Sequence, residues 1–124
     1  MDDKNNQEEN DLSKISEVEL IKKITKSFKN TNKSTIIDIG DDAALLKFDK
    51  TNVTISQDIL VEGVHFDLSY MPLKHLGYKS VIVNISDIIS MNVKPSHILV
   101  SIAVSNIFKI NALEELYEWI NLAC

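Results

Sequence analysis

A largely apolar stretch in the second half of the chain carries three polar side chains whose spacing decides its secondary structure. Ser80, Asn84 and Asp87 stand at positions i, i+4 and i+7, which is one stripe of an α-helix. A strand would scatter the same side chains over both of its faces. Although Val81-Ile82-Val83 has strand propensity, the stripe favours a helix over 73–91. Such a helix must bury its apolar side against a second layer of structure.

The other elements follow from hydrophobic periodicity and turn residues. Ser16 and Glu19 have capping-box spacing, which indicates the start of a helix. Helices are predicted over 17–29, 73–91 and 109–124, and strands over 35–39, 43–48, 53–58 and 96–104. This alternation of strand-rich stretches and helices predicts an α+β or α/β layered fold.

Composition limits the classes of protein that fit. The 124 residues suffice for one domain. Of the net charge of −5, most comes from residues 1–11, which hold five acids and one lysine. We therefore expect a disordered acidic tail over 1–13 and a domain over 14–124. The sequence has no basic stripe, no apolar run of membrane-spanning length and a single cysteine, Cys124. These features argue against a nucleic-acid surface, a membrane span and an internal disulfide, and favour a cytoplasmic protein.

Four acidic residues on separate predicted elements are candidates for metal binding. They are Asp41, Asp42, Asp58 and Asp87. Adjacent carboxylates in an apolar stretch repel each other unless a positive charge meets them. Mg²⁺ with oxygen ligands would compensate them and could also hold phosphates. The sequence has neither a P-loop nor a Gly-x-Gly-x-x-Gly loop, so phosphate chemistry here would depend on metal ions.

Simpler interpretations stay open for each acid taken alone. Acids next to a glycine or at a strand end are commonly solvated turn residues, and Asp87 could be a buried acid held by a cap or a serine. Alternation along the predicted strand places Ser56 and Asp58 on one face and Gln57 on the other. Gln57 could then join the same site only through its backbone or at a bulge.

Three segments in order resemble the thiamine-monophosphate kinase family, part of the superfamily of aminoimidazole ribonucleotide synthetase and selenophosphate synthetase. The segments are Ile-Gly-Asp-Asp-Ala-Ala-Leu-Leu at 39–46, Ser-Gln-Asp-Ile-Leu-Val-Glu-Gly-Val-His-Phe at 56–66 and Val-Asn-Ile-Ser-Asp-Ile-Ile-Ser-Met at 83–91. The resemblance runs from about Val18 to the last residue. Gly-Val-His-Phe around His65 favours the kinase over its relatives.

The resemblance implies an α+β domain with a mixed sheet covered by helices on one face. In the family this sheet pairs with that of a second subunit, so a homodimer is expected. The implied reaction transfers the γ-phosphoryl group of ATP to thiamine monophosphate, giving thiamine diphosphate. It is expected to proceed in line, with several Mg²⁺ ions and without a catalytic side chain that becomes phosphorylated.

Matching positions imply a role for each site residue. Asp42, Ser56, Gln57, Asp58 and Asp87 correspond to metal ligands, His65 to a substrate contact, and Asp42 and Tyr117 to nucleotide contacts. Asp41 and Asn84 are expected beside the ligands rather than on the metal. The family usually has threonine at the position of Gln57, so a metal contact there would use the backbone or a weaker amide oxygen.

The family's Gly-Gly-Asp-Thr loop and C-terminal domain would follow Cys124. The chain is therefore expected to be a fragment of the enzyme and to be inactive in isolation. Two alternatives stay open. The chain could derive from another enzyme of the superfamily, or it could be a dimerisation module that has lost the chemistry.

Overall fold

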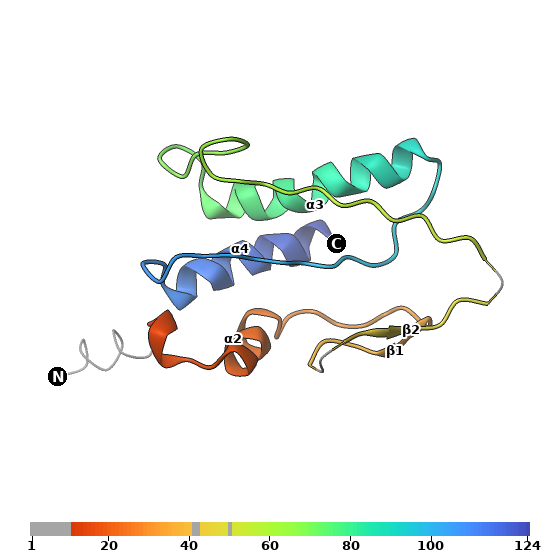
Figure 1. Cartoon of the computed structure of the whole chain (residues 1–124), viewed down its shortest axis with the longest axis horizontal. Helices are drawn as coiled ribbons and strands as arrows, with labels where there is room; N and C mark the ends of the chain where they lie inside the picture. The colour runs from red at the N-terminus through yellow and green to blue at the C-terminus, as the bar shows by residue number, and fades with distance from the viewer. Residues whose placement is uncertain (1–10, 41–42, 50) are drawn as a thin grey trace.

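The computed structural model describes residues 11–40, 43–49 and 51–124 (Figure 1). The elements, in chain order, are the 3₁₀-helix η1 (Leu12–Lys14), helix α2 (Glu17–Ile24), strands β1 (Thr35–Ile37) and β2 (Leu45–Leu46), and helices α3 (Leu73–Ser90) and α4 (Ile110–Ala123). None of the helices in these ranges combines the length and apolar character needed to cross a membrane. The long helix predicted from the polar stripe is confirmed as α3, and the C-terminal helix as α4.

Helix α3 packs along α4, and α2 covers another side of α4 (Figure 1). The apolar stripe of α4 supplies most of the buried side chains, and each neighbouring helix adds one or two. The core cluster consists of Ile24, Leu76, Val81, Leu113, Leu116, Tyr117 and Ile120. Burying side chains of this size is worth about 1.5–3 kcal/mol each, so the helical layer holds most of the stability of the domain.

Gly77 allows α3 and α4 to approach closely. A Cβ atom at this position would collide with the backbone carbonyl oxygen of Leu116 and would lie 3.2 Å from Cβ of Trp119. A backbone atom in the middle of a helix cannot move aside as a flexible side chain can. The distance between the two helices is therefore set by the absence of a side chain at residue 77.

Helix α2 begins as predicted but ends earlier. The Ser16 hydroxyl accepts from the Glu19 N–H at 3.3 Å, and the Glu19 carboxylate accepts from the Ser16 N–H at 3.2 Å. The hydrogen bonds from Ser16 lower the pKa of Glu19. At the other end, the Thr25 hydroxyl donates to the Ile21 carbonyl at 2.6 Å. The Ile21 carbonyl also keeps its helical bond from the Thr25 N–H, at 3.0 Å. Beyond it the Phe28 N–H donates to the Thr25 carbonyl in a tighter turn, and α2 ends at Ile24 rather than at residue 29.

Two residues of the predicted tail, Asp11 and Leu12, contact the rest of the described structure. Asp11 forms an isolated bridge with Lys109, and Leu12 packs against the core cluster. The carboxylate of Asp11 accepts from the Ser13 N–H at 3.0 Å, which caps the short η1 turn. The remainder of the predicted tail, 1–10, lies outside the described residues, and the division into a tail and a domain stays a prediction.

Strands β1 and β2 form a two-stranded antiparallel sheet. Thr35 pairs with Leu46 and Ile37 with Leu45, with an irregularity in register between the two pairs. These strands fall within the predicted ranges 35–39 and 43–48 but are shorter. A two-stranded pair of this length is marginal without further strands or a covering helix.

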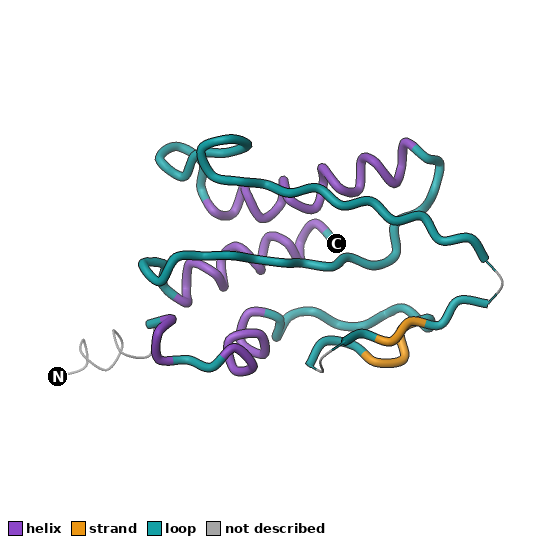
Figure 2. Tube along the Cα trace, viewed as in Figure 1, coloured by secondary structure: helices purple, strands orange, loops and turns teal. Residues whose placement is uncertain are grey.

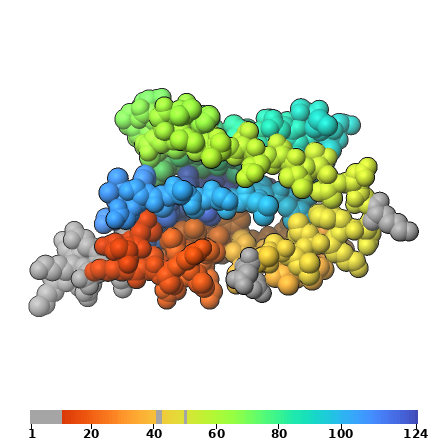
Figure 3. All heavy atoms as spheres, in the orientation of Figure 1, coloured from red at the N-terminus to blue at the C-terminus, as the bar shows by residue number. Residues whose placement is uncertain are grey.

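The strands predicted over 53–58 and 96–104, and with them the mixed sheet, are not formed. Both segments are drawn as loop in Figure 2. Within the described residues, no backbone–backbone hydrogen bond joins 53–58 or 96–104 to another segment. A strand exists only when a second backbone pairs with it, and neither segment has such a neighbour. Both run across the same face of the molecule (Figure 3).

Side chains fix the start of the 96–104 segment. The Asn32 side-chain amide donates to the Ser96 carbonyl at 2.6 Å. Nε2 of His97 lies 3.1 Å from the Thr35 hydroxyl oxygen, and the Phe48 ring stands edge-on to the imidazole at 6.0 Å. This end of the segment is therefore attached to the β1–β2 pair even though its backbone is unpaired.

We expect Gly77→Ala to destabilise the domain by about 1–3 kcal/mol, because the added methyl group overpacks the helix contact. In a helix without this contact, the same substitution would stabilise by about 1 kcal/mol, so the sign of the effect is diagnostic. Ser86→Ala is the control, since Ser86 is exposed on α3 and bonds only to its own helix. Urea unfolding of the three proteins measures the difference. A stabilised Gly77→Ala variant would contradict this helix packing.

Candidate functional site

Two hydrogen bonds attach the 56–58 segment to the polar stripe of α3. The Ser56 hydroxyl donates to Oδ2 of Asp87 at 3.1 Å, and the backbone N–H of Asp58 donates to Oδ1 of Asn84 at 2.8 Å. The Asn84 amide group in turn donates to the Ser80 carbonyl at 2.9 Å. This second bond fixes which way the Asn84 side chain points. We call these four residues, together with Ser80, the α3 clamp.

The clamp follows from matching periodicities. Residues 56 and 58 share one face of an extended chain and lie about 7 Å apart. Residues 84 and 87 lie close to one turn apart on a helix, or about 5 Å along its axis. Because 56 meets 87 and 58 meets 84, the segment runs antiparallel to α3. The two bonds bring Ser56 and the backbone of Asp58 against Asn84 and Asp87 of α3.

The carboxylates of the clamp are exposed and carry no paired cation. Among the described residues, neither Asp58 nor Asp87 has a lysine, arginine or histidine within ion-pair distance. The donor set consists of carboxylate and hydroxyl oxygens, which suits a hard divalent cation. Gln57, which lies between Ser56 and Asp58 in sequence, is exposed as well.

The first acid motif cannot be placed against the clamp, because Asp41 and Asp42 lie outside the described residues. Gly40, just before them, has φ of +124°, a backbone region that only glycine enters readily. In the ranges that are described, no group of three or more histidine, cysteine, aspartate or glutamate side chains is positioned to hold a metal ion. The metal roles of Asp42, Ser56, Gln57, Asp58 and Asp87 remain predictions.

His65 sits in a tight turn whose hydrogen bonds fix its ring. Nδ1 accepts from the backbone N–H of Val61 at 3.0 Å, and the Gly63 N–H donates to the Phe66 carbonyl at 2.8 Å. With Nδ1 acting as an acceptor, the proton of the neutral ring is on Nε2. The ring is thus held in a tautomer that can donate a hydrogen bond to a ligand.

Lys79 is a residue that the sequence reasoning missed. Its ammonium donates to the His65 carbonyl at 2.8 Å and so attaches the His65 turn to α3. The signal in the sequence was its position next to Ser80, at the start of the polar stripe. A lysine on a helix is usually solvated, which hides such a role.

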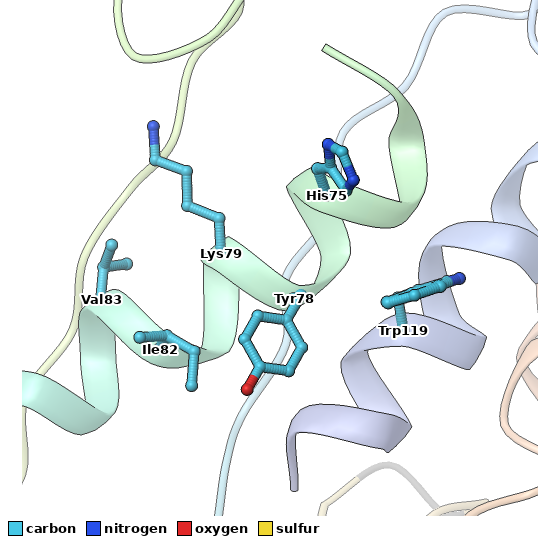
Figure 4. Close-up of a pocket in the computed structure, with 6 residues that line it drawn as sticks. All are labelled: His75, Tyr78, Lys79, Ile82, Val83 and Trp119. Atoms are coloured by element: carbon cyan, nitrogen blue, oxygen red, sulfur yellow. The ribbon is translucent and has the colours of Figure 1, made fainter.

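Two hollows flank α3 and share Lys79 and Val83. The larger, of about 430 Å³, is lined by His75, Tyr78, Lys79, Ile82, Val83 and Trp119 (Figure 4). It contains none of the predicted site residues and is mainly apolar. The smaller, of about 230 Å³, is lined by Asp58, Ile59, Leu60, His65, Lys79 and Val83. Because it joins a predicted metal ligand to the predicted substrate contact, the smaller hollow is the better candidate for a ligand site.

Tyr117 lies in the core rather than in either hollow. It is 6% exposed, and its ring meets Phe28 edge-on at 6.4 Å. Burial raises the pKa of its phenol. This position gives Tyr117 a packing role, and its contact with a nucleotide remains a prediction.

The similarity of this chain to known proteins includes the segments that form the α3 clamp. The family model described as "AIR synthase related protein, N-terminal domain" matches residues 40–124. The chain belongs to this family. The match covers β2, α3, α4 and both segments that form the clamp, so the predicted resemblance is confirmed at the level of the family.

Several curated relatives named thiamine-monophosphate kinase are similar to this chain. The protein from Buchnera aphidicola subsp. Schizaphis graminum is 47% identical over 89 residues, and that from Bacillus subtilis is 39% identical over 89. Each alignment covers 71% of this chain and 27% of the relative. The Aquifex aeolicus protein is 33% identical over 96 residues, covering 77% of this chain and 30% of its own. The chain thus spans little more than a quarter of their length. No solved structure matches.

We expect Asn84→Ala to release the backbone at Asp58. Losing one hydrogen bond worth about 1 kcal/mol should speed amide hydrogen exchange at Asp58 by about fivefold. Nuclear magnetic resonance of the 124-residue chain can follow this amide. Ser86→Ala, on the exposed side of the same helix, should leave the rate unchanged. Equal exchange at Asp58 in Asn84→Ala and the unmodified chain would rule out the clamp.

Proposed function

We propose that this chain is the N-terminal part of a thiamine-monophosphate kinase, which transfers the γ-phosphoryl group of ATP to thiamine monophosphate. The observation that carries the proposal is the α3 clamp. It joins the second and third segments of resemblance, and it leaves two unpaired carboxylates exposed at their junction. The names of the relatives support the same activity.

Mg²⁺ ions would be held by Asp58, Asp87 and the Ser56 hydroxyl, with Asp42 and Gln57 completing the set. These oxygen donors fit the ion, and no cation on the described residues competes for Asp58 or Asp87. When bound, the metal neutralises the phosphate charge that this chain has no P-loop to hold. Asp41 would stand beside these ligands, and Asn84 fixes the backbone that carries Asp58.

The remaining roles concern the substrates. Asp42 and Tyr117 would contact the nucleotide, and His65 would contact thiamine monophosphate through Nε2. The hydrogen bond from Val61 to Nδ1 supports this role, because it orients the ring before a ligand binds. Phosphoryl transfer depends mainly on position and charge, so no side chain of this chain needs to act as a nucleophile.

A homodimer is part of the proposal. The unpaired backbones of 53–58 and 96–104 offer edges to which a second chain can add strands. Their side chains support pairing, since Ile55 is 83% exposed and Leu99 91% exposed. A dimerisation module without chemistry would use the same edges, so the metal test below separates the two readings.

We expect the 124-residue chain to bind Mn²⁺, a spectroscopic substitute for Mg²⁺, through Asp58 and Asp87. Asp58→Asn and Asp87→Asn should each weaken binding by at least about tenfold, because each removes a charged oxygen ligand. Asp58→Asn keeps the clamp, which uses only the Asp58 backbone. Electron paramagnetic resonance of free Mn²⁺ measures the affinity.

Asp67→Asn is the matched control for charge. Asp67 lies in a separate turn, where hydrogen bonding from the Ser69 side chain and from the Ser69 N–H, the latter at 2.8 Å, lowers the pKa of its carboxyl group. The control should bind Mn²⁺ like the unmodified chain. Equal losses in all three variants would indicate general charge attraction, and the proposed metal site would be wrong.

We expect the chain to associate at high micromolar concentration, and Leu99→Lys to shift it toward monomer. The added charge opposes burial of the 96–104 segment against another copy. Leu122→Lys is the control, because Leu122 is 63% exposed and belongs to α4, not to that segment. Sedimentation velocity measures the distribution. A monomeric unmodified chain under these conditions would count against the homodimer.

A further inference from the structure

Lys79 is the only lysine among the described residues that line the smaller hollow, which is also lined by the acidic residue Asp58. The residue is half-buried on α3, and its one recorded partner is the neutral carbonyl of His65, at 2.8 Å. None of the described carboxylates lies within ion-pair distance of it. An ammonium has three N–H donors, so two remain for a ligand. In Figure 4 the side chain extends from α3 toward the neighbouring loop.

His65 adds a second donor to the same hollow. Its Nδ1 is occupied by the Val61 N–H, so Nε2 carries the proton of the neutral ring. Ile59, Leu60 and Val83 supply apolar walls. Ile59 is itself 75% exposed, so the hollow is open to solvent, and charge-assisted hydrogen bonds would have to hold a ligand there. The hollow therefore combines an ammonium, an imidazole N–H and low-polarity walls, which suits an anion with several acceptor oxygens.

We propose that the smaller hollow binds the phosphoryl group of the phosphorylated substrate and that Lys79 selects for it. This inference rests on the proposed kinase function and assigns the substrate's phosphate to the smaller hollow. The geometry supports it because the hollow reaches from His65, the proposed substrate contact, to Asp58, a proposed metal ligand. A phosphate bound here would lie beside the metal that holds the nucleotide.

Asp58 makes binding of an anion in the smaller hollow dependent on a cation. Its carboxylate faces the same hollow and repels an anion unless a cation neutralises it. Anion binding should therefore be stronger with Mg²⁺ present than without it. If Lys79 only tethers the His65 turn, Lys79→Gln should weaken binding of thiamine and thiamine monophosphate alike.

The test is calorimetric binding of inorganic phosphate, thiamine monophosphate and thiamine to the 124-residue chain, with and without Mg²⁺. We expect the unmodified chain to bind thiamine monophosphate more tightly than thiamine. Lys79→Gln should weaken binding of both phosphate-bearing ligands by about tenfold or more and leave thiamine unchanged. Lys79→Arg should keep most of the preference, because it keeps the charge.

Lys74→Gln is the matched control. It removes the same charge from the same helix, but Lys74 lies over the Trp119 ring, 6.0 Å from its centroid, and lines neither hollow. Equal effects of Lys74→Gln and Lys79→Gln, or absence of phosphate binding by the unmodified chain, would overturn the proposal. Failure of the unmodified chain to bind Mn²⁺ through Asp58 and Asp87 would instead overturn the kinase function, while a Lys79-dependent phosphate site would stand.

Discussion

The close contact between α3 and α4 at Gly77 determines where everything else in the domain can lie. With no side chain at this position, the Leu116 carbonyl can sit directly against α3. The core side chains of both helices then interdigitate, and α2 closes over α4 through Ile24. At the edge of this packed face, Ser80 and Asn84 are half-buried and Asp87 is exposed. The helix pair thus presents its polar stripe on a surface that cannot shift without disrupting the core.

Some residues of the polar stripe of α3 hold the backbone of neighbouring segments, while the charged carboxylates stay exposed. Asn84 holds the amide of Asp58, while the carboxylates of Asp58 and Asp87 stay in solvent. Lys79 holds the turn of His65 through a backbone carbonyl in the same way. These two contacts to backbone atoms leave the Asp58 carboxylate and Nε2 of His65 available for ligands, whereas the Ser56 hydroxyl donates to Asp87. Holding the backbone in place reduces the ordering that binding would otherwise require.

Local patterns predicted the helices well, because the information for a helix lies within the segment itself. The stripe of Ser80, Asn84 and Asp87 identified α3 and also the surface that meets the 56–58 segment. The predictions of strands over 53–58 and 96–104 were wrong for the opposite reason. A strand depends on pairing with a second backbone, which its own sequence does not specify. The end of α2 at Ile24 was not predicted, because the apolar periodicity continues to Phe28 although the backbone turns after Ile24. Lys79 was missed because its importance comes from the turn it reaches, not from its neighbours in sequence.

At Gly40, backbone conformation alone restricts which residue the position accepts. Its φ of +124° excludes other residues on conformational grounds, although a Cβ atom there would meet nothing within 4 Å. Invariance at this position in a set of homologous sequences would therefore report the bend of the chain, not participation in phosphate transfer. Variation at the two acids that follow, Asp41 and Asp42, would carry the chemical information instead. Neighbouring positions of this motif are thus constrained for different reasons, by backbone conformation at residue 40 and by chemistry at the two aspartates.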